Sequence, residues 1–331
     1  MRTLLPVAAI VCCLGFAGDA TAQGKTDFSI SPFIGKGFGY TKWVMQMSGY
    51  VDVDVYGTVK SELDYPLDAL YGGVELRIGS SPTAFKGWSV KLSVGTNLND
   101  PSNVMKDHDW ITIPGYFDEK ISYTESSVKM SSILGAVEGQ LTLARSRIVR
   151  FGLIGGVRYQ HFDQKLYGAV GWQLDTALER FYFNAYQDTL VLTYKVTYTM
   201  PNIGLFYRLQ FNASSSAELR GAFTIPFVSD EDDHVLRNRL ATASSTGMGF
   251  IGGIKLRFAP QLAGKKMRPF VELDGELLSI DAKPKQTIKW YGDDPITPDP
   301  ADDETGDIIT GIPHHITSKQ GYITARVGLT F

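Results

Sequence analysis

The chain is dominated by segments in which apolar and polar residues alternate with a period of two. In the last segment, 320–331, the apolar face carries Gly321, Ile323, Ala325, Val327, Leu329 and Phe331, and the other face includes Gln320, Thr324 and Arg326. The same alternation recurs in segments 150–159, 218–227, 248–258 and 268–278. Because successive side chains of a strand point to opposite faces, this period predicts β-strands throughout the chain.

Charged residues recur on the polar face in the middle of these predicted strands. Glu272, Asp274 and Glu276 alternate with apolar residues, and Lys255 and Arg257 do the same in the preceding strand. Such charges need water on their face, whereas the apolar face needs either lipid or a second sheet. A soluble sandwich satisfies this pattern with a second sheet, and a transmembrane barrel satisfies it with lipid outside and a polar lumen inside. The terminal Phe331 after an alternating strand favours the barrel, and we expect the lumen charges to pair and close the pore.

The connections between predicted strands alternate between short and long. Their spacing predicts one all-β domain over 23–331, a closed antiparallel barrel of ten strands, with short turns facing the periplasm and long loops facing outward. Four tryptophans, Trp43, Trp88, Trp172 and Trp290, are candidates for aromatic girdles at the membrane interfaces. The short turns fall near 79–86, 144–147, 212–216 and 259–266, and the long loops near 47–56, 99–118, 163–188, 229–245 and 291–313.

The N-terminus and the composition agree with export. Residues 1–22 combine Arg2, an apolar run too short to span a membrane and a small-residue cleavage site at 20–22, which predicts a signal peptide. Both cysteines, Cys12 and Cys13, lie inside it, so the mature chain is expected to lack disulfides and thiolate metal sites. A formal net charge of -3 indicates no nucleic-acid partner.

Two pairs of ionisable residues with i, i+2 spacing are the candidate chemistry. Asp107 and Asp109 lie in the second long loop, and Asp232 and His234 open the fourth. In a ten-strand barrel the strands before these loops are nearly opposite each other, so the two pairs are expected to face one another across the mouth.

These residue types suit hydrolysis by an activated water. His234 accepts a proton near its ordinary pKa of about 6.5, and Asp232 orients the ring and stabilises its charged form. Asp107 and Asp109 are close enough to repel each other, so we expect them either to share a proton or to have one raised pKa, and together they can position the same water. Two other interpretations are a solvated acidic loop and a calcium site, although no regular ligand loop supports the calcium site.

The motifs resemble those of the omptin family, which are ten-strand outer-membrane endopeptidases. The resemblance rests on 104–110 with its Asp-x-Asp-Trp block, on 229–234 with its Asp-x-His block, and on 200–205, in an order that follows the family along nearly the whole mature chain. It implies that Asp232 and His234 activate the attacking water and that Asp107 and Asp109 bind and orient it. It also implies cleavage beside basic residues, with Asp230 at the base of one substrate pocket and Asp118 or Glu119 serving the other side.

The sequence departs from the family in two respects. The family's second pocket acid has no clear counterpart, since 40–43 reads Tyr-Thr-Lys-Trp. The lipopolysaccharide-binding signature is reduced to pieces in 157–161, and the matching arginine of the next strand is Thr197. Lipopolysaccharide therefore stays an optional activator, with Arg158 as a contact for anionic lipid if it lies above the membrane.

The sequence thus predicts a water-activated, aspartyl-type endopeptidase of the Gram-negative outer membrane, with its active site on the extracellular side. The expected partners are a cationic peptide or protein substrate and outer-membrane lipid, and we expect a monomer that needs neither cofactor nor metal. The alternative is a non-enzymatic barrel, either an adhesin or a narrow pore, whose acidic loops bind cations or host surfaces.

Overall fold

The computed structural model describes residues 26–52, 55–80, 87–175, 178–260, 267–295 and 305–331. The predicted signal peptide lies outside the described residues, as do parts of the predicted turns at 79–86 and 259–266. Within the described part, no helix is long and apolar enough to cross a membrane.

The described chain consists almost entirely of antiparallel strands. A single 3₁₀ turn, η1 (Val235–Arg237), follows β10. The strands are β1 (Thr26–Asp52), β2 (Val55–Pro66), β3 (Leu70–Ser80), β4 (Trp88–Asn97), β5 (Met105–Ile113), β6 (Phe117–Arg145), β7 (Val149–Leu174), β8 (Arg180–Gln210), β9 (Ser215–Thr224), β10 (Phe227–His234), β11 (Arg239–Phe258), β12 (Arg268–Ala282), β13 (Lys285–Trp290) and β14 (Ile308–Thr330).

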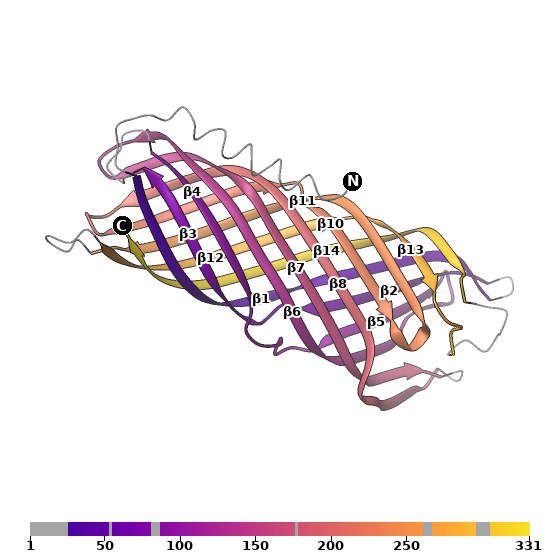
Figure 1. Ribbon diagram of the computed structural model, residues 1–331. Coiled ribbons are helices and arrows are strands. Elements are labelled where there is room, and N and C mark those ends of the chain that lie inside the picture. The colour runs from indigo at the N-terminus through magenta and orange to yellow at the C-terminus, as the bar shows by residue number, and fades with distance from the viewer. Residues whose placement is uncertain (1–25, 53–54, 81–86, 176–177, 261–266, 296–304) are drawn as a thin grey trace.

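The strands form a ring. At one end the order of pairing is β1-β3-β4-β6-β7-β8-β9-β11-β12-β14, and at the other end β2, β5, β10 and β13 take the places of β3, β4, β9 and β12. β14 pairs back with β1 from Ser29 opposite Thr330 to Met45 opposite His314. Figure 1 shows β3, β4 and β12 at the end that holds the C-terminus, with β2, β5 and β13 at the far end. The all-β prediction is therefore confirmed, with strands arranged as a ring.

The outward face is apolar over one part of each long strand and polar beyond it. On β8 the outward residues Tyr207, Leu205 and Ile203 are exposed, and towards the far end they give way to Thr197 and Lys195. The same change occurs elsewhere: Val327 and Ile323 of β14 are followed by the polar Lys319 and Thr317. An apolar outer belt of this kind is the surface that lipid covers. The strands extend beyond it into water.

This extension corrects the predicted long loops. Most of 99–118, 163–188 and 229–245 is hydrogen-bonded strand, belonging to β5, β7, β8, β10 and β11. Above the apolar belt both faces of a strand can be polar, so the alternation that reveals a strand in the sequence fades there. The prediction that four tryptophans belong to aromatic girdles is also partly wrong. Trp43 and Trp290 are each only 3% exposed and belong to clusters of buried residues.

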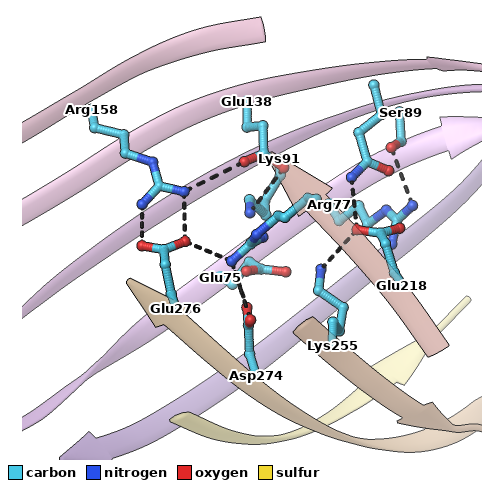
Figure 2. A network of polar contacts seen from close by, with 12 residues as sticks. Glu75, Arg77, Ser89, Lys91, Glu138, Arg158, Glu218, Lys255, Asp274 and Glu276 are labelled. Carbon is cyan, nitrogen blue, oxygen red and sulfur yellow. Dashed lines mark hydrogen bonds and ion pairs between the residues drawn. The ribbon is translucent and has the colours of Figure 1, made fainter. Parts of the chain in front are cut away.

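At the level of the apolar belt, a network of ion pairs lies in the interior of the ring (Figure 2). Arg220 contacts Asp274 at 3.0 Å and Glu276 at 2.6 Å, and Arg158 binds Glu276 through both ends of its guanidinium. Lys255 and Arg257 both contact Glu272. The predicted internal pairing of these lumen charges is confirmed. The prediction that Arg158 meets anionic lipid is wrong, because its side chain points into this network.

The stability of the folded protein is expected to depend on each cation of this ion-pair network. Arg220→Met leaves Asp274 and Glu276 without that cation, and breaking a buried ion pair by removing one partner typically costs about 3–5 kcal/mol. We expect a markedly lower thermal unfolding midpoint, read from the heat-dependent mobility of the refolded protein in gels. Arg147→Met, at an exposed position of the β6–β7 turn, is the matched control. Equal midpoints for both variants would contradict this role of the network.

Candidate active site

The two predicted pairs lie on strands at the far end of the ring, not in loops. Asp107 and Asp109 belong to β5, and Asp232 and His234 belong to β10. Among the described strands, β6, β7 and β8 separate β5 from β10 on one side, and β11, β13, β14, β1 and β2 separate them on the other. The two pairs therefore lie on opposite walls of the ring, in the part of the strands that extends beyond the apolar outer belt.

The wall formed by β10 presents three ionisable side chains to the interior. Burial alternates along the strand, so Asp230 (5% exposed) and Asp232 (1% exposed) point inward, and His234 continues the same face. The Nε2 atom of His234 lies 3.2 Å from Oδ2 of Asp232. The His234 side chain keeps 21% of its surface exposed, so it reaches the water of the mouth. This is an imidazole held by a buried carboxylate.

The wall formed by β5 presents two carboxylates. Ser122 on β6 donates a 2.6 Å hydrogen bond to Asp109, whereas the buried Oδ1 atom of Asp107 has no hydrogen-bond partner among the described residues. Burial raises the pKa of Asp107, and the nearby carboxylates of Asp109 and Asp232 raise it further. Because Asp232 belongs to the other wall, its effect on Asp107 places the two walls within electrostatic reach of each other.

Two stacked tyrosines lie beside these carboxylates. The rings of Tyr65 on β2 and Tyr194 on β8 are 3.8 Å apart and nearly parallel, and both side chains are buried. Burial raises the pKa of Tyr65, and the carboxylates of Asp232, Asp107 and Asp230 add to that rise. Tyr65 therefore lies near both walls. The sequence analysis missed both tyrosines, because they are ordinary aromatic positions in strand-like segments.

A buried histidine completes the group on the β10 side. The Nε2 atom of His314 on β14 lies 3.1 Å from Oδ2 of Asp230, and both side chains are buried. The Trp43 ring lies 5.4 Å from the imidazole. Burial raises the pKa of Asp230, while its hydrogen bond with His314 opposes that rise. The sequence analysis assigns no role to His314, which shares the inward face of β14 with Ile316 and Ser318.

Asp118, the other predicted substrate residue, does not join this group. It lies at the start of β6, where it accepts a 2.8 Å hydrogen bond from Thr112 across the β5–β6 hairpin. Ser122, four residues further along β6, is the residue opposite Asp109. At a rise of about 3.3 Å per residue, Asp118 lies roughly 13 Å nearer the hairpin tip than Asp109.

The buried oxygen atoms of this group suit proton transfer and water binding. Oδ1 atoms of Asp107, Asp230 and Asp232 and the hydroxyls of Tyr65 and Tyr194 are buried and have no hydrogen-bond partner among the described residues. Buried polar atoms without protein partners are satisfied by water or by a ligand. In the described part of the chain, His, Cys, Asp and Glu side chains form no group of three or more suited to a metal ion.

Comparisons with known proteins agree with this architecture. The model of the omptin family matches residues 56–257. Among solved structures, the outer membrane protease OmpT of Escherichia coli is similar with a TM-score of 0.68 at 13% identity, over 92% of this chain and 96% of that one. OprG of Pseudomonas aeruginosa matches with a TM-score of 0.32 at 10% identity, over 93% of this chain and 97% of its own, which is too weak a superposition to inform the fold. A search of curated proteins finds no match.

OmpT establishes the fold, and the family model establishes membership. The matched segment covers more than half of the chain and contains both the β5 and the β10 walls. The chain therefore belongs to the omptin family of outer-membrane proteases.

Proposed function

We propose that this protein is an aspartyl-type endopeptidase whose attacking water is activated by Asp232 and His234 and held from the opposite wall by Asp107 and Asp109. The observation that carries the proposal is the hydrogen bond between Asp232 and His234 on one wall. Asp232 also lies close enough to the opposite wall to raise the pKa of Asp107. A partly exposed imidazole that is held by a buried carboxylate and faces further carboxylates suits general-base attack by water on a peptide carbonyl.

In this mechanism each side chain has a distinct role. His234 takes a proton from the water as the oxygen attacks the carbonyl carbon, and it returns that proton to the leaving amine. Asp232 stabilises the imidazolium while the charge lasts. Asp107, with its raised pKa, shares a proton with its neighbour Asp109, so that one carboxyl group donates and the other accepts around the same water.

The proposed substrates are peptides or unfolded protein loops with basic residues near the cut bond. Asp230 lies two residues before Asp232 on the same inward face, and its Oδ1 atom is buried without a hydrogen-bond partner among the described residues. Acidic side chains at the mouth also concentrate cationic peptides through their field. Asp118 at the hairpin tip suits an early contact with such a peptide better than a place beside the cut bond.

The proposed topology is a closed barrel of ten strands with the site on the extracellular side. The count of ten follows if β2 and β3, β4 and β5, β9 and β10, and β12 and β13 are each taken as one interrupted strand. The extension of the strands beyond the apolar belt at the end with the site supports that orientation, because long hairpins of outer-membrane barrels face outward. Lipopolysaccharide is a candidate activator.

Substrate turnover tests the proposed function directly. The protein, refolded with and without lipopolysaccharide, is offered a quenched peptide containing a Lys-Arg pair and a matched peptide with Ala-Ala in its place. We expect cleavage of the first peptide at least about tenfold faster, since a charge-assisted contact is worth roughly 1.5–3 kcal/mol. Absence of turnover for both peptides in both conditions would favour the non-enzymatic adhesin.

A further inference from the structure

The end of the ring that holds the C-terminus contains a cavity of about 350 Å³. Among the described residues, its lining includes six arginines and a single carboxylate, Asp27. The arginines are Arg77, Arg145, Arg150, Arg208, Arg257 and Arg268, and each comes from a different strand. We call this cavity the arginine vestibule.

Nearby carboxylates offset part of this charge. Arg268 pairs with Asp27 at 2.8 Å, Arg208 pairs with Glu218, and Arg257 lies 3.5 Å from Glu272. Glu218 and Glu272 also contact Lys255, so they are shared with another cation. The lining of the vestibule is therefore strongly electropositive.

The rest of the lining suits an oxyanion. Arg77 donates a hydrogen bond to Ser89 at 3.1 Å, and the hydroxyls of Ser89 and Thr330 belong to the lining. Guanidinium groups present planar pairs of N–H donors that match the oxygens of phosphate and carboxylate. Because these groups approach from several strands around the ring, they suit an anion that offers oxygens in several directions.

The vestibule is separate from the proposed active site. The ion pairs of Arg158, Arg220, Glu276 and Asp274 lie in the interior between the two ends. The vestibule therefore lies at the end with the short turns, and the proposed active site lies at the other end.

We propose that the arginine vestibule is a binding site for a small soluble anion with two or more phosphate groups. Each tetrahedral phosphate accepts hydrogen bonds from several guanidinium groups, which a planar carboxylate of equal charge does less well. The volume lies within the range of small-molecule sites, about 300–1,000 Å³.

Pyrophosphate is the probe that tests this proposal. The full chain, refolded in zwitterionic detergent at low salt, is titrated calorimetrically with pyrophosphate and separately with citrate as the carboxylate comparison. We expect one saturable pyrophosphate site that binds more tightly than citrate. In Arg77→Gln/Arg150→Gln, pyrophosphate affinity should fall by at least about tenfold, because charged hydrogen-bond donors are lost.

Two further variants keep the result interpretable. Arg147→Gln, on the exposed β6–β7 turn and outside the lining, should bind pyrophosphate as the wild type does. Arg150→Lys keeps the charge but loses the planar pair of donors, so its affinity should be intermediate. The proposal is overturned if the wild type shows no saturable binding, if citrate binds as tightly, or if Arg147→Gln weakens binding as much as the double variant does.

Discussion

Asp232→Asn and His234→Ala are each expected to lower kcat/KM for the Lys-Arg peptide by about 10²–10⁴-fold, which is the usual contribution of a general base. Asparagine keeps the shape of Asp232 but cannot stabilise an imidazolium, and alanine removes the proton acceptor itself. Their hydrogen bond of 3.2 Å makes the two residues one functional unit, so the double variant should lose little more than either single variant.

Each substitution has a matched control, one on β10 and one on β14. Asp233 points outward and accepts a 2.9 Å hydrogen bond from Tyr291, so Asp233→Asn changes an acidic residue next to the site without touching the interior. His315→Ala removes an outward histidine of β14 that contacts Asp281. Both controls should keep turnover within about threefold of the wild type, since surface substitutions are usually worth under roughly 0.5 kcal/mol. Hydrolysis that survives in both Asp232→Asn and His234→Ala would rule out the mechanism.

Asp107→Asn is expected to combine loss of hydrolysis with a gain in stability. Burial and the carboxylates of Asp109 and Asp232 raise the pKa of Asp107 above its ordinary value of 3.8, so the folded protein holds this proton more tightly than the unfolded chain. Well below that ordinary value both states are protonated and Asp107 carries no penalty. As the pH rises from there through the raised pKa, the penalty for ionising Asp107 in the folded state grows, and above it the penalty is constant.

Asparagine cannot ionise, so the variant avoids this penalty. The unfolding midpoint of Asp107→Asn should exceed that of the wild type by more at pH 8 than at pH 4, while kcat/KM falls by about 10²–10⁴-fold. The control Asp118→Asn, at the exposed hairpin tip, should have nearly the same unfolding midpoint as the wild type at both pH 4 and pH 8. A lower midpoint for Asp107→Asn at pH 8 would show that the carboxylate stabilises the fold and is not under electrostatic strain.

The fold was largely predictable where lipid imposes the pattern. Segments such as 268–278 and 320–331 must place apolar residues outward and polar residues inward, so their alternation identified β12 and β14 directly. Beyond the apolar belt the outward face is polar, and the buried inward face mixes apolar with ionisable residues, so the alternation is weaker there. For this reason β5, most of β10, the last part of β7 and the first part of β8 were predicted as loops.

The candidate site was predictable only in part, for a similar reason. The i, i+2 spacing of Asp107 with Asp109 and of Asp232 with His234 is a local signal that puts both members of each pair on one strand face. Tyr65, Tyr194 and His314 carry no such signal, since each is a single residue in an ordinary strand. Their role appears only when their neighbours from other strands are known.

The sequence by itself determined the β-rich class, the apolar and polar faces of the long strands and the residue types of the two walls, because each depends on neighbours along one strand. The tertiary structure alone decided that Asp232 acts on Asp107, that His314 pairs with Asp230, and that six arginines share one cavity. These contacts depend on the curvature and pairing register of the whole ring, which no local pattern specifies.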